Sequence, residues 1–347
     1  MNWNFRFITD WDYLFTESFQ GQWLQWVESA ENSHVFFHPV LCMAWIETYL
    51  PLRNLDLLFC IAEGEESTIV LPLVVWNQNW KNAWRRLIVP VGFSDFDYHD
   101  PLLVGAKIST DSLDQFYSEL LRQLSGMVAF DELILDGLTA ESTLKEHSAE
   151  NDVAPFLVLS EVSNGDQLLK MLPSHLRGDI KRRIRRYDEK GFLSIVHFNH
   201  DSEFTQLSQF LKAHSSRWPG AFKAPNFHVN LLKYGSSSGL VHFSGLFVDE
   251  SVISWHLGFV YNNRYNYYMS AIESSWADFS PGKLHIFKLM EYAVQQKFEV
   301  FDFLRGGETY KTGWTNQQRQ IYQLRCSSGR KISRVKKLAV EFKNFLR

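Results

Sequence analysis

Five consecutive residues in the second half of the chain, Ser280-Pro281-Gly282-Lys283-Leu284, form a candidate anion-binding helix start. Ser280 is a good N-cap residue, Pro281 suits the first helical position, and Gly282 has no side chain to obstruct a ligand. The first N–H groups of a helix lack intrahelical acceptors and lie at its positive end, so they can bind a phosphate or diphosphate. Lys283 would add positive charge. An ordinary capped helix explains the same residues equally well.

The elements around this motif follow from the periodicity of the apolar residues. Three alternating runs with short polar turns predict an antiparallel meander over 240–248, 252–261 and 264–272. A helix over 281–296, a strand over 299–304 and a strand over 320–326 follow. Upstream, the sequence predicts strands over 156–159 and 192–198 and helices over 165–190, 201–215 and 227–234.

This order of elements resembles the GNAT acyltransferase fold, in particular the CelD/BcsL-type proteins of polysaccharide biosynthesis, with the Fem peptidyltransferases as tandem-domain relatives. The resemblance rests on the helix start at Ser280, the strand Phe301-Asp302-Phe303-Leu304-Arg305-Gly306-Gly307, and the run Glu308-Thr309-Tyr310-Lys311-Thr312-Gly313-Trp314. In that family a hydrophobic-Asp-hydrophobic strand ends in Gly and precedes E-x-Y-K-x-x-W. The usual Q/R-x-x-G-x-G/A phosphate loop is missing here, so an aminoacyl-tRNA donor stays open beside acyl-CoA.

The resemblance implies an α+β fold with tandem GNAT-like domains, each a mostly antiparallel mixed sheet flanked by helices. It covers about residues 160–330, and a weaker likeness extends over the first half. That half is itself mixed, with predicted helices over 10–29, 33–50 and 112–124 and predicted strands over 55–62, 68–76, 86–91 and 132–136. We therefore expect a degenerate domain over 1–150, the active GNAT domain over 151–330, and a basic amphipathic helix over 331–347.

If the resemblance holds, the acyl-pantetheine arm lies where the strand ending at Ile272 splays from the strand ending at Leu304. Backbone amides there would polarise the thioester carbonyl. The implied cofactor-binding residues are Ile272, Ser280, Pro281, Gly282, Lys283, Leu284 and Leu304. The expected co-substrate is acyl-CoA, with acetyl-CoA as the first choice, and no metal is expected.

The resemblance also implies candidate catalytic residues. An attacking acceptor needs a base for its proton, and the departing thiolate needs an acid. Glu273 is the leading base, Glu308 the second, and Tyr310 the acid. A solvated loop carboxylate explains each glutamate, and an aromatic residue at the edge of the core explains Tyr310.

Contacts with the acceptor are expected from both halves of the chain. In the second half they are Arg305, Lys311 and Trp314; a surface lysine is the alternative for Lys311. In the first half they are Asp97, Tyr98 and His99, in a polar-aromatic loop expected to face the interdomain cleft, although an ordinary turn explains it too. The carboxylates near His99 have no second cluster at a compatible spacing, so no metal site is predicted.

The amino-acid composition excludes several classes of protein. Hydrophobic residues make up 45% and charged residues 21%, and the net charge is −4, so no overall charge recruits nucleic acid. No apolar run is long enough to span a bilayer and no secretory signal is recognised, which predicts a cytoplasmic protein. Cys42, Cys60 and Cys326 are widely separated and are predicted to be buried and free.

Each of two basic segments has two possible interpretations. The helix around 177–186 either holds phosphates of CoA or acceptor, or only solubilises an exposed face. The tail over 331–347 either rests on the inner membrane surface or packs against its domain.

These observations predict transfer of an acyl group from acyl-CoA to an amine or hydroxyl of a sugar-containing polysaccharide or cell-envelope precursor. One alternative is a Fem-like transferase that uses aminoacyl-tRNA. Another is a non-catalytic GNAT-fold subunit of a polysaccharide biosynthesis or export assembly.

Overall fold

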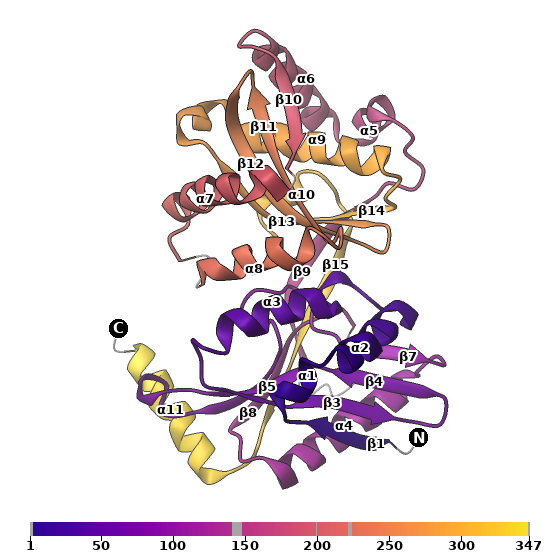
Figure 1. The fold of residues 1–347 in the computed structure, drawn as a ribbon, viewed down its shortest axis with the longest axis vertical. Coiled ribbons are helices and arrows are strands. Elements are labelled where there is room, and N and C mark those ends of the chain that lie inside the picture. Colours follow the sequence, from indigo (N-terminus) through magenta and orange to yellow (C-terminus); the bar gives the residue numbers. More distant parts are fainter. Residues whose placement is uncertain (1–2, 141–147, 199, 221–223, 346–347) are drawn as a thin grey trace. The chain divides into compact units, whose positions relative to one another are not determined.

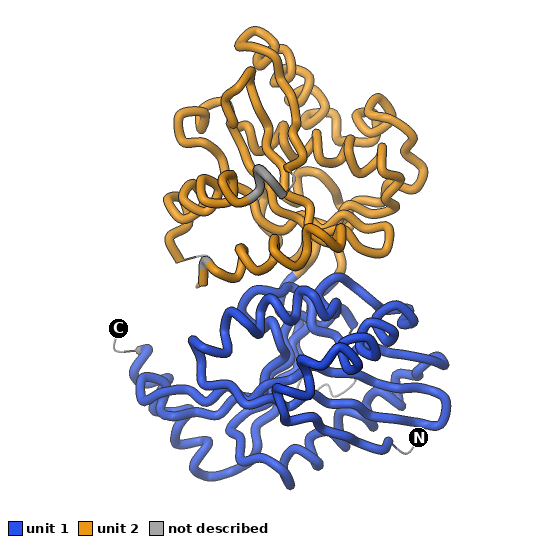
Figure 2. Tube along the Cα trace, in the orientation of Figure 1, with its two compact units in different colours: residues 1–152, 320–347 blue, residues 153–319 orange. Residues whose placement is uncertain are grey.

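The computed structural model describes residues 3–140, 148–198, 200–220 and 224–345. It divides into two compact units, unit 1 (residues 1–152 and 320–347) and unit 2 (residues 153–319), coloured separately in Figure 2. Residues 320–330, which the sequence analysis assigns to the second domain, belong to unit 1. They do so because β15 (Gln318–Ser327) pairs antiparallel with β8 (Glu132–Leu138) of that unit.

Unit 2 is built on a mixed sheet with the order β10-β11-β12-β13-β14-β9 (Figure 1). Its strands are β10 (Leu193–His197), β11 (Val241–Val248), β12 (Ser251–Tyr261), β13 (Arg264–Ile272), β14 (Val300–Asp302) and the end of β9 (Ser148–Val158). β11, β12 and β13 form the predicted antiparallel meander. Its turns place Asp249, Asn262 and Asn263 at positive φ, which short polar residues tolerate.

Helices cover both faces of this sheet. On one face lie α5 (Gly165–Met171), α6 (Ser174–Asp188) and α9 (Pro281–Gln295), which share the apolar core of unit 2. On the other lie α7 (His200–Arg217) and α8 (Pro225–Gly235), and there Trp255 of β12 donates to Gln206 of α7. The single helix predicted over 165–190 is broken at Leu172, which is extended because a residue before proline disfavours the α conformation.

Unit 1 contains a sheet of order β1-β3-β4-β7 and strands in the order β15-β8-β6-β5-β2. The strands not yet defined are β1 (Asn4–Ile8), β2 (Leu55–Leu57), β3 (Phe59–Glu63), β4 (Ser67–Leu71), β5 (Leu73–Asn77), β6 (Arg86–Pro90) and β7 (Leu102–Gly105). The predicted hairpin is present, with Glu63 opposite Thr68. Each of its predicted strands is interrupted, at Leu58 and Pro72, and so contributes to both sets of strands.

The helices of unit 1 are α1 (Trp11–Leu14), α2 (Glu17–Ser29), α3 (Pro39–Tyr49), α4 (Thr110–Met127) and α11 (Lys331–Phe345). The helix predicted over 10–29 is divided because the Thr16 hydroxyl accepts a hydrogen bond from the Phe19 N–H and starts a new helix. No described helix has the length and apolar character needed to cross a bilayer. The three cysteines are free and buried, as predicted.

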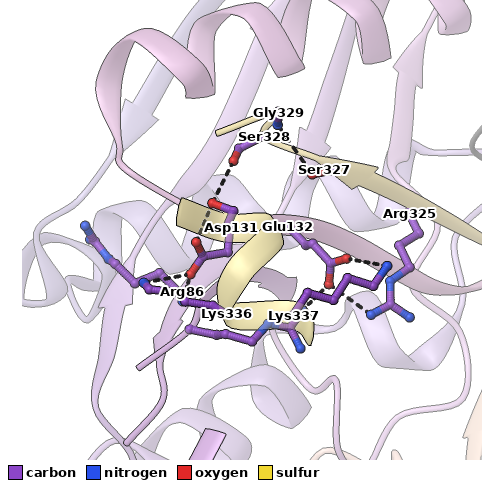
Figure 3. A network of polar contacts seen from close by, with 11 residues as sticks. Arg86, Asp131, Glu132, Arg325, Ser327, Ser328, Gly329, Lys336 and Lys337 are labelled. Atoms are coloured by element: carbon purple, nitrogen blue, oxygen red, sulfur yellow. Dashed lines mark hydrogen bonds and ion pairs between the residues drawn. The ribbon is translucent and has the colours of Figure 1, made fainter. Parts of the chain in front are cut away.

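A buried carboxylate holds α11 on unit 1 (Figure 3). Asp131 Oδ1 accepts a hydrogen bond from the Ser333 hydroxyl, and Oδ2 accepts one from the Arg86 N–H and lies 3.2 Å from Lys336 Nζ. Burial opposes ionisation of Asp131, but these partners outweigh it and hold its pKa below the usual range. Next to it, Glu132 pairs with Arg85, Arg325 and Lys337.

We expect Asp131→Ala to lower the free energy of unfolding by about 3 kcal/mol, because it strands a lysine and an N–H group that are largely buried. Asp56→Ala is the matched control, since Asp56 is an exposed partner of Arg86 at 3.8 Å; it should cost less than about 1 kcal/mol. Urea unfolding measures both, and equal losses would contradict the assignment of Asp131 as the anchor of α11.

Candidate functional site

The parallel strands β13 and β14 stay together for only three residue pairs. The pairing runs from Arg264 opposite Val300 to Asn266 opposite Asp302. Beyond it, β13 continues to Ile272 paired with β12, while the chain after β14 stays with the β9 segment through backbone hydrogen bonds to 153 and 155. The two strands therefore diverge at the place predicted for the acyl-pantetheine arm.

A β-bulge in β13 accompanies this divergence. Leu257 lies opposite Met269 and Phe259 opposite Asn266, so β13 has one extra residue facing Gly258. A Cβ atom at Gly258 would lie 2.6 Å from His256 Cε1 and 2.7 Å from the carbonyl oxygen of Asn266. The glycine thus allows the sheet to bend here without displacing a buried ring.

The start of α9 departs from the prediction at Ser280. This residue adopts a left-handed conformation, with φ 52°, and its hydroxyl caps no N–H group, so the predicted side-chain N-cap is wrong. Among the described residues, no acceptor takes the N–H groups of Gly282 and Lys283. Gly282 lies beside Ile272, since a Cβ there would be 3.6 Å from Ile272 Cγ2. Leu284 and Pro281 are buried and fix the helix to the core.

Basic side chains of α6 reach the segment directly before α9. Arg183 donates to the carbonyl oxygen of Phe279 at 2.7 Å, and the Arg186 guanidinium lies 4.1 Å from the centre of the Phe279 ring. Lys283 lies 3.4 Å from Asp179, which also binds Arg183. Burial opposes ionisation of Asp179, yet Arg183 and Lys283 prevail and hold its pKa below the usual range. The ammonium group of Lys283 is therefore already paired with the Asp179 carboxylate.

The predicted catalytic residues differ in their surroundings. Glu273 follows β13 directly, is half-buried, and accepts a hydrogen bond from the Ser274 hydroxyl at 3.1 Å. Glu308 precedes the short helix α10 (Thr309–Thr312), is largely exposed, and pairs with Lys311 at 3.1 Å. Tyr310 is partly exposed on α10. No cation among the described residues pairs with Glu273, which makes it the better candidate for the predicted base.

Lys311 is buried, so the alternative of a surface lysine is wrong. Its ammonium donates to the carbonyl oxygen of Arg305 and pairs with Glu308, which closes the loop after β14. Asp302 orients the same loop, because its carboxylate accepts the Leu304 N–H at 2.8 Å. Leu304 is buried at φ 60°, an uncommon conformation for leucine.

Trp314 lines a cavity whose described lining does not include the front of α9. It is buried in the apolar core, and the cavity, of about 750 Å³, is also lined by residues of α5 and the end of β9. The described residues lining this cavity include none of the predicted acyl-CoA contacts. A contact of Trp314 with an acceptor stays a prediction, and it would be made through this cavity.

Asp97, Tyr98 and His99 belong to unit 1, whereas the other candidates belong to unit 2. Tyr98 and His99 are buried, and His99 Nδ1 lies 2.7 Å from the carbonyl oxygen of Asp136. Asp97 is half-buried and its carbonyl oxygen lies against Gly137, which has φ 87°. These contacts show a loop tied into the core of unit 1, which leaves Asp97 as the more accessible of the three.

A chain of hydrogen-bonded rings beneath α9 was not predicted from the sequence; its outer ring, His197, is exposed, whereas Tyr265 and His256 are buried. His197 and His242 are hydrogen-bonded at 2.7 Å, His242 and the Tyr265 hydroxyl at 2.7 Å, and that hydroxyl and His256 at 3.1 Å. Burial lowers the pKa of His242 to about 3 and that of His256 well below its ordinary value. The signal in the sequence was the place of His242 and His256 within predicted meander strands, where a polar residue needs a partner if it points inward.

Residues 174–312 match the family model described as an acetyltransferase (GNAT) domain. The chain contains a GNAT-fold domain. Its matched segment lies within unit 2 and includes the diverging strands and the start of α9. No curated protein matches this sequence.

Several solved structures share the fold over nearly the whole chain. FemX is 10% identical, with 92% of this chain and 96% of that chain covered and a TM-score of 0.62. The C-terminal domain of a putative lysylphosphatidylglycerol synthetase from Agrobacterium fabrum is 8% identical, over 92% and 95%, with a TM-score of 0.56. A tandem GNAT protein from the clavulanic acid biosynthesis pathway is 11% identical, over 95% and 100%, with a TM-score of 0.51. The last likeness supports the predicted arrangement in two domains.

We expect the free energy of unfolding to fall as the pH is lowered from 7 to 5. Partly buried His242 and buried His285 have folded-state pKa values of about 3 against an ordinary 6.5, so below pH 6.5 the unfolded chain binds more protons than the folded one and is stabilised relative to it. Each histidine adds a slope of up to about 1.4 kcal/mol per pH unit. Urea titrations should show a smaller slope in His242→Gln, while the exposed His175→Gln keeps it. A free energy of unfolding that does not change over this pH range would contradict the assignment of His242 and His285 as neutral in the folded state.

Proposed function

We propose that unit 2 transfers an acyl group, with acetyl as the first choice, from acyl-CoA to an amine or hydroxyl of a polysaccharide or cell-envelope precursor. The observation that carries the proposal is the divergence of β13 from β14 directly beside the start of α9. The N–H groups of Gly282 and Lys283, which no described acceptor takes, suit a diphosphate, and the gap between the strands suits an extended thioester arm. Arg183 and Arg186 add positive charge at the same end.

The reaction proposed is direct attack by the acceptor on the thioester carbonyl. Glu273 takes the proton of the attacking amine or hydroxyl, the new C–N or C–O bond forms, and the C–S bond breaks. Tyr310 gives a proton to the departing thiolate. Backbone N–H groups of β13 beyond Asn266 would stabilise the oxyanion; the end of the pairing with β14 at Asn266 supports this assignment. Lys311 acts by fixing the loop that carries Tyr310.

The CelD/BcsL type is supported by the Phe301-Asp302-Phe303 strand and the E-x-Y-K-x-x-W run. The similarity to FemX and to the synthetase domain favours a precursor of the cell envelope as acceptor, and it keeps an aminoacyl-tRNA donor as the second candidate. Retention on immobilised tRNA, together with no binding to CoA, would favour that second candidate.

Gly282→Ala tests the diphosphate site without disturbing the fold. A Cβ atom at position 282 would lie at an ordinary van der Waals distance from Ile272. The variant should therefore be as stable as the wild type or more so. If phosphates approach this backbone, titration calorimetry should show CoA affinity reduced about tenfold. Gly126→Ala in α4, where nothing lies within 4 Å, is the matched control and should bind CoA normally. Unchanged affinity in Gly282→Ala would remove the site from α9.

The assignment of the base is tested separately from donor binding. With acetyl-CoA and a surrogate amine, Glu273→Gln should lower kcat at least about 100-fold while CoA affinity is kept. Glu308→Gln should mainly lower the melting temperature, because it leaves buried Lys311 with one partner fewer. Wild-type rates in Glu273→Gln, Glu308→Gln and Tyr310→Phe alike would point to catalysis without a protein base, whereas no turnover even by the wild type would point to a non-catalytic subunit.

A further inference from the structure

Helix α11 lies on unit 1 with its polar side inward. Ser333 and Lys336 reach the buried carboxylate of Asp131, and Lys336 Nζ also donates to the carbonyl oxygen of Trp84. Near the other end of the helix, Lys343 Nζ donates to the carbonyl oxygen of Lys81. Residues 333, 336 and 343 recur at helical spacing and form one stripe. The helix is thus anchored by hydroxyl and ammonium groups, as Figure 3 shows for Lys336 and Lys337.

The opposite side of α11 is apolar and open to solvent. Ile332, Val335, Leu338 and Phe342 recur at helical spacing, and each is between 51% and 66% exposed. The anchors on the inward side prevent this stripe from turning toward unit 1. A face of this kind is unusual in a soluble domain, where the apolar side of a surface helix packs inward.

Two exposed tryptophans lie beside this helix. Trp80 belongs to the short 3-10 helix η2 (Trp80–Asn82), which contacts α11, and Lys343 Nζ lies 4.9 Å from the centre of its ring. Trp84 follows at a positive φ of 49° and is 67% exposed. Tryptophan combines a large apolar ring with an N–H donor, and for that reason it is enriched at the boundary between lipid and water.

The charges around the apolar stripe favour an anionic partner. The segment 330–345 contains Glu341 as its one acidic residue, against Arg330, Lys331, Arg334, Lys336, Lys337 and Lys343. Arg330, Lys331 and Arg334 are exposed, and no described carboxylate pairs with them. This local excess contrasts with the net charge of −4 for the whole chain. A basic helix with an exposed apolar stripe and flanking tryptophans has the composition of an interfacial membrane helix.

We propose that the outer face of α11, together with Trp80 and Trp84, binds the surface of a membrane that carries anionic lipids. The apolar stripe would enter the boundary between head groups and acyl chains, and Arg330, Lys331 and Arg334 would neutralise head-group charge. The proposal is independent of the acyl-transfer chemistry proposed for unit 2. It commits to lipid rather than to a second copy of this chain, because two copies meeting through this face would oppose like charges.

Co-sedimentation of the full chain with vesicles tests this proposal. Binding is expected to vesicles of phosphatidylcholine with one third phosphatidylglycerol, and to be at least about tenfold weaker with phosphatidylcholine alone or at high salt. Leu338→Gln/Phe342→Gln should weaken binding to the mixed vesicles at least about tenfold. Neither side chain contributes to the anchoring contacts, so melting temperature should be unchanged.

Phe192→Gln is the matched control, since Phe192 is an equally exposed phenylalanine in unit 2 and should leave vesicle binding unchanged. Three outcomes would overturn the proposal. They are no binding to the mixed vesicles, equal binding by the Leu338→Gln/Phe342→Gln variant, or concentration-dependent dimers in light scattering that this variant abolishes. The last would assign the face to a second copy of the chain.

Discussion

The structure of unit 2 depends on which strand, β13 or β9, stays hydrogen-bonded to the chain after β14. After Asp302 the chain remains hydrogen-bonded to the β9 segment, so β13 loses its parallel partner six residues before its end. The bulge opposite Gly258 lets β13 turn away at the same level. An unpaired strand edge inside a sheet is costly unless its N–H and C=O groups find other partners. That constraint makes the gap a place where a ligand with an extended amide-bearing arm would be stabilised.

The groups around the gap are held by ion pairs rather than left to solvent. Asp179 positions Lys283 and Arg183 beside the start of α9. Lys311, buried between Arg305 and Glu308, fixes the loop that follows β14. These contacts place Lys283 and Lys311 as positioning residues more than as free charges for a substrate. In unit 1, Asp131 plays the comparable role for α11.

Local patterns predicted the elements of unit 2 well, because alternation in the meander and helical periodicity in α9 reflect burial on one side. The divergence of the strands near Ile272 and Leu304 came from the family resemblance. The features that were predicted wrongly or not at all depend on contacts between residues distant in sequence or on one backbone angle. Ser280 offers a capping hydroxyl, yet its left-handed conformation turns that group away. The burial of Lys311 and the pairing of β15 with β8 have no local signature, and the histidine chain beneath α9 is marked only by the place of His242 and His256 in the meander strands.

Hydrogen exchange in the presence of acetyl-CoA tests the central claim most directly. If the donor binds where β13 leaves β14, exchange should slow in peptides that cover 267–272, 281–284 and 303–306, and stay unchanged in unit 1. Protection confined to the segments 157–162 and 314–317, which line the cavity at Trp314, would contradict the account. So would protection of no segment at saturating acetyl-CoA.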